Sequence, residues 1–515
     1  RQRYLAAVLR EHGFSVELAS FSAAAEQDAV LWHTWLARPR VIGLSVIFQY
    51  RAPEFLELAT RLRELLPSAH ITAGGHFPTF AADALLHDYP ALDSIVRGEG
   101  EFTLLELVER IDTPAEWDSI PGLSFRDRMS GTVVHNPARP LIADLDTLPF
   151  PVRDTPPQQH LGHGYAPILG SRGCTHRCSF CSIHPFYRSS HGKAQRFRSV
   201  PNVVDEMEAL YRDLGVLFFV FNDDEWFPPG KARYTRTEAF CQEISRRAIQ
   251  PIISIKCRAD DVEKDIFRML QDMGVVRVYV GVESGSDHSL QSLAKGATVA
   301  QNRRALETLH ELDMLADFGL IIFDPYSTLD DMRANLAFLR EMAGTGLAPL
   351  SFGRMEVYAG TPILQRLQRE GRLTGNYMAW NYTIPDARVE MLWRLIIAAM
   401  RQRYYENAGM GKQAFIACYE LLIYRHLHAP RFDPALADEL RRIVAAVNNH
   451  SLDVFEEMLD FVVRADIRDV RGVNTRAQQW AEIVSAADVD FQIALERWHA
   501  EVASRVVSQV PVVGD

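Results

Sequence analysis

The sequence lacks the features that mark several large protein classes. Six cysteines in 515 residues are too few for a disulfide-dense small domain. The apolar run at Val216–Phe221 is far shorter than the roughly 18 residues of a membrane span. Lys and Arg number 55 against 66 Asp and Glu, and this net charge of -11 disfavours general binding to nucleic acid or anionic membrane. No signal peptide opens the chain, so we expect a cytoplasmic protein without nucleic-acid or membrane partners.

The composition is that of a soluble chain with real cores, because 47% of the residues are hydrophobic and 23% are charged. At roughly 150 residues per domain, the length suggests about three domains. The first part alternates helix and strand. Apolar spacing predicts a helix over residues 1–12, followed by strands at 14–20, 41–48, 70–75 and 94–101. A doubly wound α/β unit normally begins with a strand, so we expect a further strand upstream of residue 1.

A second α/β series follows a proline-rich stretch at 137–157. Its strand candidates lie at 166–171, 217–223, 253–258, 276–284, 316–323 and 351–358. Six strand–helix repeats in roughly 200 residues predict a partial barrel rather than a closed eightfold one. The fold class is therefore α/β, with a predicted Rossmann-like domain at 1–136, a linker at 137–160, a partial (β/α)6 barrel at 161–383 and a helical domain at 384–515.

Three of the cysteines crowd into eight residues at the end of the first barrel strand. The spacing of Cys174, Cys178 and Cys181 lets one loop wrap three thiolates around a soft-metal centre. The main alternative is zinc, with a fourth ligand from one of three nearby histidines: His176, His184 or His191. Zinc loops usually present two pairs of ligands, and the sequence has no second cysteine pair. The pattern therefore favours an iron–sulfur cluster.

A basic run follows this loop, formed by Arg188, His191, Lys193, Arg196 and Arg198. Such a run is more often a solvated segment than a binding site, although one arginine could meet a carboxylate or phosphate. The other cysteines, Cys241, Cys257 and Cys418, are expected to be small buried residues.

The loop resembles the radical S-adenosylmethionine (SAM) enzymes, whose signature is CxxxCxxC with an aromatic residue before the third cysteine. Phe180 occupies the aromatic position. The resemblance implies a [4Fe-4S] cluster held by three thiolates, with the fourth iron open to the amino and carboxylate groups of SAM. Electron transfer into the sulfonium would then yield a 5'-deoxyadenosyl radical, with the protein positioning the cofactor.

The ends of the later barrel strands extend this resemblance. Asp223 or Asp224 would take the SAM ammonium, and Arg258 closes the third strand. Glu283 and Ser284 match positions that meet the ribose and methionine parts of SAM. A lone acidic pair at a strand end is usually a helix cap or a solvated turn. The ordered succession of these strand ends behind the cysteine loop favours a site at the barrel mouth instead.

The sequence departs from the family at Phe323–Ser327, where many relatives carry a Pro-Gly-Glu turn. This departure makes Asp324 and Tyr326 the candidate catalytic residues on the substrate side. The helices after residue 383 are expected to cap the barrel mouth, although an ordinary amphipathic core fits their pattern equally well.

The N-terminal half resembles the cobalamin-binding domain that precedes the barrel in one large radical SAM subgroup. The matching segments are 43–48, 72–79 and 96–101, each just after a parallel strand, where open α/β sheets bind ligands. Glycines in these segments allow the backbone to approach a corrin ring or its nucleotide tail. The resemblance implies cobalamin contacts at Ser45, Gly74, Gly75, His76, Gly98, Glu99 and Gly100.

The DxHxxG motif, whose histidine binds cobalt from below in other cobalamin proteins, is absent, as it is in much of this subgroup. The resemblance therefore implies cobalt with no protein histidine beneath it. Gln49, Tyr50 and Arg51 are candidates to cover that lower face, and an ordinary surface loop is an equally good interpretation. An open lower position would favour methyl transfer to a carbon radical.

Taken as a whole, the resemblance implies a cobalamin-dependent C-methyltransferase. It would abstract hydrogen with a 5'-deoxyadenosyl radical and transfer methyl from methylcobalamin to an unactivated carbon. The alternatives are a non-methylating cyclisation or rearrangement, and a radical SAM enzyme whose Rossmann-like domain does not bind cobalamin. A zinc-dependent nucleic-acid binder is disfavoured by the charge. The expected partners are a small-molecule, carrier-bound or peptide substrate and an external electron donor of the flavodoxin or ferredoxin type.

Overall fold

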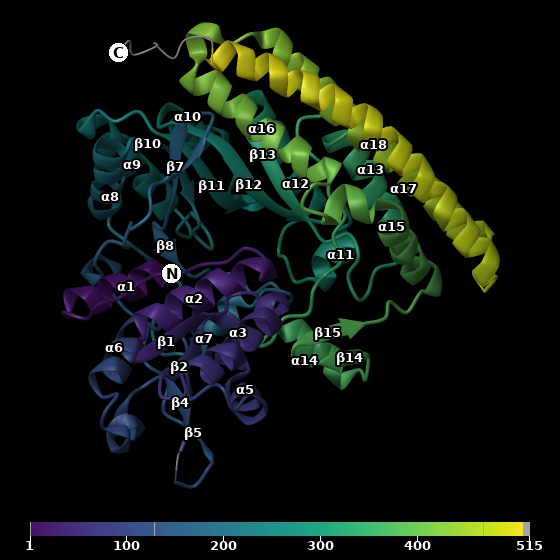
Figure 1. The fold of residues 1–515 in the computed structure, drawn as a ribbon. Coiled ribbons are helices and arrows are strands. Elements are labelled where there is room, and N and C mark those ends of the chain that lie inside the picture. The colour runs from purple at the N-terminus through teal and green to yellow at the C-terminus, as the bar shows by residue number, and fades with distance from the viewer. Residues whose placement is uncertain (1, 128, 467, 508–515) are drawn as a thin grey trace. The chain divides into compact units, whose positions relative to one another are not determined.

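The chain forms two compact units (Figure 1). The computed structural model describes residues 2–127, 129–466 and 468–507. Unit 1 comprises the chain up to Pro156, then Ser171–Asn202 and Glu356–Tyr382. Unit 2 comprises Pro157–Gly170, Val203–Met355 and the chain from Thr383 onward. This division places the cysteine loop in the same unit as the N-terminal residues. It therefore does not test the four domain ranges predicted from the sequence, which stay predictions.

Unit 1 is built on a five-stranded sheet in the order β1-β2-β3-β4-β5. The strands are β1 (Val41–Ser45), β2 (His70–Gly74), β3 (Ser94–Val96), β4 (Leu123–Arg126) and β5 (Val133–His135). The first three pair in parallel, as predicted, and β4 and β5 continue the sheet antiparallel. The helices are α1 (Gln2–Glu11), α2 (Gln27–Ala37), α3 (Ala52–Leu65), α4 (His76–Phe80), α5 (Ala82–Asp88) and α6 (Glu101–Glu109). Ile71 of β2 and Ile95 of β3 are fully buried in the hydrophobic core of unit 1, because both faces of a parallel sheet are covered.

The strand predicted at 14–20 is wrong, since these residues form no strand. A strand needs a neighbour for its N–H and C=O groups. A hollow of about 560 Å³ lies between this segment and β1, so the segment has no ladder partner there among the described residues.

The remaining elements of unit 1 frame the cysteine loop. Strands β8 (Ser171–Arg172) and β9 (Arg196–Phe197) form a short antiparallel pair, and α7 (Ile183–Arg188) lies between them in sequence. Helix α14 (Pro362–Arg369) and the hairpin of β14 (Leu373–Asn376) and β15 (Ala379–Tyr382) complete the unit. The β8–β9 pair fixes both ends of the loop, so the three cysteines lie on a closed segment.

Unit 2 contains the predicted half-barrel, a six-stranded sheet in the order β13-β12-β11-β10-β7-β6. Its parallel strands are β7 (His163–Ile168), β10 (Val216–Phe221), β11 (Ile252–Arg258), β12 (Val275–Glu283) and β13 (Leu315–Leu320). The sixth strand is β6 (Gln158–His160), which pairs antiparallel with β7. The strand predicted at 351–358 is wrong. It makes two isolated bridges, Arg354 with Phe323 and Val357 with Trp380, and no ladder with β13, which has already ended at Leu320.

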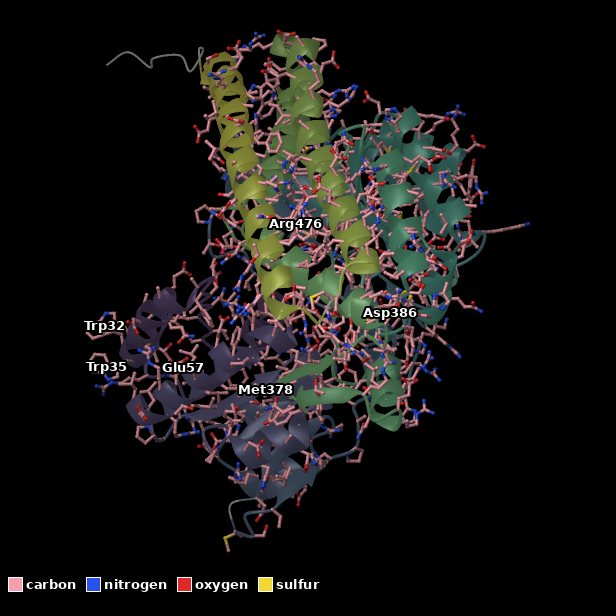
Figure 2. The ribbon with its side chains drawn as sticks, turned by 90° about the vertical axis from the view of Figure 1, so that its right-hand side faces the viewer. Trp32, Trp35, Glu57, Met378, Asp386 and Arg476 are labelled. Carbon is pink, nitrogen blue, oxygen red and sulfur yellow. The ribbon has the colours of Figure 1, made fainter. Side chains whose placement is uncertain are left out.

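Helices cover both faces of this sheet. Along the barrel they are α8 (Val200–Leu214), α9 (Ala232–Arg247), α10 (Lys264–Asp272), α11 (Asp287–Ser292), α12 (Val299–Glu311) and α13 (Leu329–Met342). The expected C-terminal helices are α15 (Ala387–Tyr405), α16 (Met410–Leu427), α17 (Pro434–Arg464) and α18 (Val470–Val507). Helices α17 and α18 run side by side, as Figure 2 shows. Leu422 of α16 packs against Phe218, Ile252 and Val276 of the sheet. No helix in the described part of the chain is long and apolar enough to cross a membrane.

Candidate active site

The cysteine loop starts at a position that only glycine can occupy. Gly173 has a φ of 86°, and a Cβ there would lie 1.8 Å from the carbonyl oxygen of Ala194. Within the loop, the N–H of Cys181 donates to the carbonyl of Cys178 at 3.2 Å. Cys178 is buried, whereas Cys174 and Cys181 are partly exposed, as is Phe180. The structure thus brings the three predicted ligands onto one constrained loop.

The donor set of this loop suits an iron–sulfur cluster, since three thiolates are soft ligands. In the described part of the chain, no three His, Cys, Asp or Glu side chains converge on a position for one metal ion. A [4Fe-4S] cluster differs from that case, because each thiolate binds its own iron atom. Outside the loop, burial raises the pKa of the Cys418 thiol to about 12 and that of Cys257 well above its usual value. Those two thiols are therefore protonated at neutral pH.

Beside the loop lies a hollow of about 290 Å³. Its lining is Arg177, Cys178, His184, Pro185, Arg188 and Pro362. Partial burial lowers the pKa of His184, and the charges of Arg177 and Arg188 lower it further. Two arginine side chains and one histidine thus lie next to Cys178 around this hollow.

A buried network of ion pairs joins the base of the cysteine loop to the end of β3. Arg172 donates to Glu99 at 3.0 Å and to Glu101 at 2.7 Å, and Arg196 donates to the second Glu99 oxygen at 2.7 Å. These four side chains are each at most 6% exposed. Burial would raise the pKa of Glu99, but the hydrogen bond from Arg196 and the charges of both arginines lower it overall. Glu99 is thus a structural link as well as a predicted cobalamin contact.

The hollow of about 560 Å³ in unit 1 is lined by every strand-end residue predicted to contact cobalamin. They come from the ends of β1, β2 and β3 and comprise Ser45, Gly74, Gly75, His76, Gly98, Glu99 and Gly100. His76 is buried, and its ring stacks on Phe186 of α7 with centroids 4.0 Å apart. The structure therefore brings this predicted set together around one cavity, whose wall also includes the helix that follows the cysteine loop.

The need for glycine at position 75 has a different cause from the predicted approach of a ligand. Gly75 has a φ of 118°, and a Cβ there would lie 2.5 Å from the carbonyl oxygen of Val46. The close approach is therefore between β2 and the end of β1.

The loop after β1 contains the three residues predicted as candidates to cover the lower face of cobalt, and their side chains have different surroundings. Gln49 is buried, and its Oε1 accepts from the N–H of Ala359 at 2.8 Å. Arg51 pairs with Glu54 of α3 at 2.7 Å. Tyr50 is 61% exposed. Two of the three side chains are thus committed to protein contacts, and Tyr50 is the one that remains exposed.

In unit 2, acidic side chains follow β10, as predicted. Asp223 is buried and accepts a hydrogen bond from the N–H of Gly170 at 3.2 Å, whereas Asp224 is partly exposed. Glu225, which the sequence analysis did not single out, is 4% exposed. Burial first and then the nearby Asp261 carboxylate raise its pKa to about 8. This strand end thus includes one carboxyl group, that of Glu225, which stays largely protonated at neutral pH.

Polar side chains at the ends of β11 and β12 form a chain. Arg258 donates to Asp260 at 2.8 Å and to the carbonyl of Lys295 at 2.6 Å, and Lys295 donates to Glu283 at 2.8 Å. Glu283 has a φ of 64°, an uncommon conformation for this residue type that marks functional sites and switch regions. Lys295 follows α11 in the chain, and it is the residue that holds the Glu283 carboxylate.

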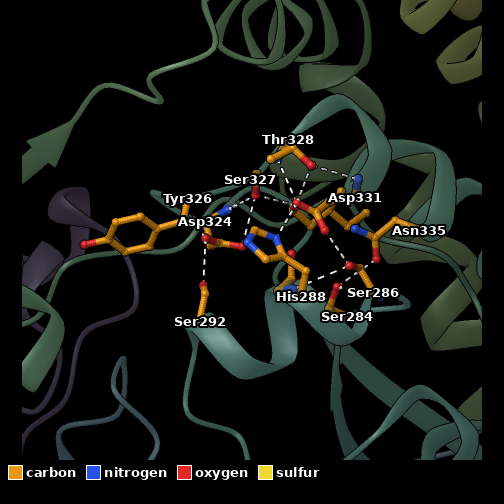
Figure 3. A network of polar contacts seen from close by, with 12 residues as sticks. Ser284, Ser286, His288, Ser292, Asp324, Tyr326, Ser327, Thr328, Asp331 and Asn335 are labelled. Carbon is orange, nitrogen blue, oxygen red and sulfur yellow. Dashed lines mark hydrogen bonds and ion pairs between the residues drawn. The ribbon is translucent and has the colours of Figure 1, made fainter.

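The predicted residues around β13 belong to a buried polar network, shown in Figure 3. Ser284 is fully buried and donates to Asn335 at 3.0 Å. Asp324 is also fully buried and accepts from the N–H of Tyr326 and from the hydroxyls of Ser327 and Ser292. The Tyr326 ring points away from this network, as Figure 3 shows. Asp324 therefore orients the turn, whereas Tyr326 is partly exposed.

Two further residues on the sheet were missed by the sequence analysis. In β12, residues 276, 278, 280 and 282 are valines, and they alternate with Arg277, Tyr279, Gly281 and Glu283 on the opposite face. Tyr279 is 36% exposed, and Lys256 of the neighbouring strand is paired with it in register. The period-2 alternation is the signal that could have identified this polar face.

Fold and site together define a radical SAM half-barrel enzyme with an attached cobalamin-type domain. The family model described as B12 binding domain matches residues 2–108, and the model described as Radical SAM superfamily matches residues 168–339. The chain therefore carries a radical SAM domain and a B12 binding domain. These two domains define its cofactors as a [4Fe-4S] cluster, SAM and cobalamin.

Similar proteins share most of this organisation. An uncharacterized methyltransferase, PH0819 of Pyrococcus horikoshii, is 28% identical over 397 residues, which cover 74% of this chain and 79% of the relative. The anaerobic magnesium-protoporphyrin IX monomethyl ester cyclase of Rubrivivax gelatinosus is 29% identical, and the match covers 66% of this chain and 61% of the cyclase. Among solved structures, the cobalamin-dependent SAM radical enzyme OxsB with aqua-cobalamin bound has a TM-score of 0.69 at 19% identity, covering 98% of this chain and 81% of OxsB. The OxsB likeness shows a shared fold.

Proposed function

We propose that this protein is a cobalamin-dependent radical SAM methyltransferase that places a methyl group on an unactivated carbon. One observation carries the proposal: the hollow lined by the strand-end residues and the cysteine loop lie in the same compact unit, joined by Glu99. The similarity to the archaeal methyltransferase supports the choice of reaction.

The residues present fit the three cofactors. Cys174, Cys178 and Cys181 would hold the cluster, and the hollow at the ends of β1, β2 and β3 would receive cobalamin. When bound, the cluster supplies the electron that cleaves SAM, and cobalamin carries the methyl group. The chain's own contribution is to bind these groups, orient them and exclude water.

The structure supports specific roles in unit 2. Asp224 would take the SAM ammonium, because the Asp223 carboxylate already accepts the Gly170 N–H. Glu283 would meet the ribose, with its carboxylate oriented by Lys295. The buried hydroxyl of Ser284 would support that strand end from behind, through its bond to Asn335.

On the substrate side, Tyr326 would contact the substrate, and Asp324 would be its positioning residue through the Tyr326 N–H at 2.8 Å. Burial raises the pKa of Asp324, which suits a residue that orients the turn and does not present a charge to solvent. Beneath cobalt, the exposed Tyr50 would cover the lower face in place of Gln49, whose amide is engaged by Ala359.

A second candidate is a non-methylating cyclisation or rearrangement, favoured by the cyclase relative that is 29% identical. Such a reaction would use the same three cofactors and the same radical initiation. It would not require a methyl group to pass from SAM to the corrin.

That difference provides the test, which needs no substrate. The full chain, reconstituted anaerobically with iron, sulfide and cobalamin, is reduced and given SAM with an isotopically labelled methyl group. A methyltransferase is expected to yield 5'-deoxyadenosine and also labelled methyl on the recovered corrin. Formation of 5'-deoxyadenosine with an unlabelled corrin would instead favour cyclisation or rearrangement. Absence of 5'-deoxyadenosine from cluster-loaded protein would refute both.

A further inference from the structure

Lys256 lies on the polar face of β11 and β12 and has no carboxylate partner among the described residues. Each neighbouring cation has such a partner: Arg258 with Asp260, Arg277 with Asp317, and Lys295 with Glu283. The Lys256 side chain is partly buried and makes no hydrogen bond or ion pair in the described part of the chain. Burial lowers the pKa of Lys256, and the charges of Asp224 and Asp223 oppose this only in part. An ammonium group held in this way costs free energy, so its presence points to an anion that binds here.

Tyr279 of β12 lies beside Lys256 in the register of the sheet. Neighbouring strands are about 4.8 Å apart, so the two residues occupy adjacent positions on one face. Tyr279 is 36% exposed, and its hydroxyl makes no hydrogen bond with a described residue. That hydroxyl lies over Gly319 of β13, where a Cβ would be 2.1 Å from the phenolic oxygen. Glycine at this position therefore leaves room for a second free donor on the face that carries the ammonium.

Helix α16 covers the same face on the side toward the N-terminal ends of the strands. The Arg277 guanidinium lies 4.7 Å from the ring centroid of Tyr419 and 5.5 Å from that of Phe415. Arg277 is 6% exposed, whereas Tyr279, two residues further along β12, is 36% exposed. The covered part of the face thus ends between these two residues, and Lys256 and Tyr279 form the first row that a ligand can reach.

We propose that Lys256 and the Tyr279 hydroxyl form an anion-binding subsite that takes the carboxylate or phosphate group of the substrate. An ammonium and a phenolic O–H both donate, and an anionic oxygen accepts from both. Binding neutralises the one cation of this row, and no bond is formed or broken. The inference rests on the proposed function, because it assumes that the half-barrel receives a substrate.

The depth of this row favours the substrate over SAM as the source of the anion. Glu283, which is proposed to meet the ribose of SAM, lies four residues beyond Tyr279 on β12. A strand rises about 3.3 Å per residue, so the row lies roughly 13 Å below that contact. We therefore assign the anion to the substrate, and the carboxylate of SAM is the alternative source that the test must separate.

The first arm of the test measures lysine reactivity in the reconstituted full chain, without turnover. The chain has six lysines, so mass spectrometry can follow the acylation of each one by N-hydroxysuccinimidyl acetate. The probes are inorganic phosphate and acetate, each compared with chloride at equal ionic strength and fixed pH. A bound anion favours the unreactive ammonium form, so one of the probes should slow the acylation of Lys256 by about threefold or more. Lys412, an exposed lysine of α16, should change by less than about twofold, because screening alone acts there.

The second arm separates the two sources of the anion. Equilibrium dialysis gives the dissociation constant of SAM for wild type, Lys256→Met and the matched control Lys412→Met. All three constants should agree within about twofold, because SAM does not use the subsite. A loss of SAM affinity of about tenfold in Lys256→Met alone would assign the anion to the SAM carboxylate and overturn the proposal.

Two outcomes of the first arm would also overturn it. Acylation of Lys256 at the same rate in chloride, phosphate and acetate would show that no anion binds there. Equal slowing of Lys256 and Lys412 would show screening by salt. This arm uses the wild type, so it stands even if Lys256→Met fails to fold.

A separate readout keeps the proposed function distinct from the subsite. Dithionite-driven formation of 5'-deoxyadenosine without substrate should be equal in wild type, Lys256→Met and Lys412→Met. Absence of this product from cluster-loaded wild type would refute the proposed function, while the protection of Lys256 by phosphate or acetate would still report on the subsite.

Discussion

The guanidinium of Arg172 donates a hydrogen bond to the Glu99 carboxylate at 3.0 Å, and both side chains are buried. Arg172 lies two residues before the first cluster cysteine, and Glu99 lies at the end of β3, where it lines the hollow of about 560 Å³. The pair therefore joins the candidate cluster loop directly to the candidate cobalamin site. A displacement of the cluster loop would therefore move the buried charge pair at the candidate cobalamin site, and a displacement at that site would move the pair at the loop.

Replacing Glu99 with Gln should destabilise unit 1 strongly. The substitution leaves Arg172 and Arg196 with an uncompensated buried charge, and breaking a buried pair in this way costs about 3–5 kcal/mol. The folded-state pKa of Glu99 is lowered from the 4.5 of the unfolded chain, so its contribution is present above pH 4.5 and is lost as the pH falls below it. Urea unfolding at neutral pH should give a much lower free energy of unfolding for Glu99→Gln than for the wild type. In acid, this difference between the two proteins should disappear.

A surface pair provides the control for this prediction. Arg61 and Asp28 pair at 2.5 Å on the exposed faces of α3 and α2, and Arg61→Gln should cost less than about 1 kcal/mol. A Glu99→Gln variant as stable as Arg61→Gln would show that the buried network does not hold the loop to β3.

Removing a single thiol of the loop should abolish the cluster. Cys181→Ser replaces a soft thiolate with a hydroxyl that is a poor ligand for iron in this setting. Iron and sulfide content and the visible absorption of the reconstituted protein should fall to background. The control is Cys241→Ser, because Cys241 donates to the carbonyl of Met269 and a serine hydroxyl can do the same. Full iron content in Cys181→Ser would contradict the three-cysteine assignment.

Glu225 should make unit 2 less stable as the pH rises. Burial and the Asp261 charge raise its folded-state pKa from 4.5 to about 8, against the opposing effects of the Phe227 N–H, Arg258 and Lys295. A raised carboxyl pKa contributes stability that is complete below pH 4.5 and is lost as the pH rises through about 8. A tenfold change in a proton-binding constant corresponds to about 1.4 kcal/mol, so the loss should reach a few kcal/mol.

The variant Glu225→Gln tests this directly, since glutamine cannot ionise. Urea unfolding of anaerobic protein without added SAM should give wild type and variant similar stabilities in mild acid, and a more stable variant above pH 8. The stability of the variant will still depend on pH in part, because burial also raises the pKa of Asp261, to about 6. Parallel stability curves for the two proteins would show that Glu225 is ionised in the folded state.

The turn between β2 and α4 should not tolerate a side chain. Gly75→Ala introduces a Cβ 2.5 Å from the Val46 carbonyl at a φ of 118°. Gly13→Ala isolates the cost of positive φ, because Gly13 has a φ of 84° with no atom within 4 Å of its Cβ. Gly13→Ala should cost about 1–2 kcal/mol, and Gly75→Ala should cost more and also reduce cobalamin retention after gel filtration. Equal stability and retention in the two variants would contradict the close approach of β2 to β1.

Some parts of the fold were predictable because their signals are local. The apolar runs at β10, β11 and β12 predict buried parallel strands, and the structure confirms them within a few residues. The segment at 351–358 was also predicted to be a strand, yet it makes only two isolated bridges, one to Phe323 beyond the end of β13 and one to Trp380 of β15. The segment at 14–20 likewise forms no strand, because strand formation depends on a neighbour that a local pattern does not specify.

The candidate site also combines features that local sequence predicts with features that depend on contacts between distant residues. Close spacing in the chain was enough to predict that Cys174, Cys178 and Cys181 share one loop. The roles of Ser284 and Gln49 could not be predicted, since their buried hydrogen bonds reach Asn335 and Ala359, which are distant in sequence. Glu225 was missed for a related reason: its raised pKa comes from burial, which is a property of the packed unit.

The sequence by itself determined the class of chemistry, because ligand identity and short-range spacing specify which cofactor a loop can hold. Only the tertiary structure decided which carboxylates are committed to arginines, which hydroxyls face the core and which guanidiniums remain exposed beside Cys178. These properties depend on contacts between residues far apart in the chain, and the dielectric and hydrogen-bond environment that they create exists only after folding.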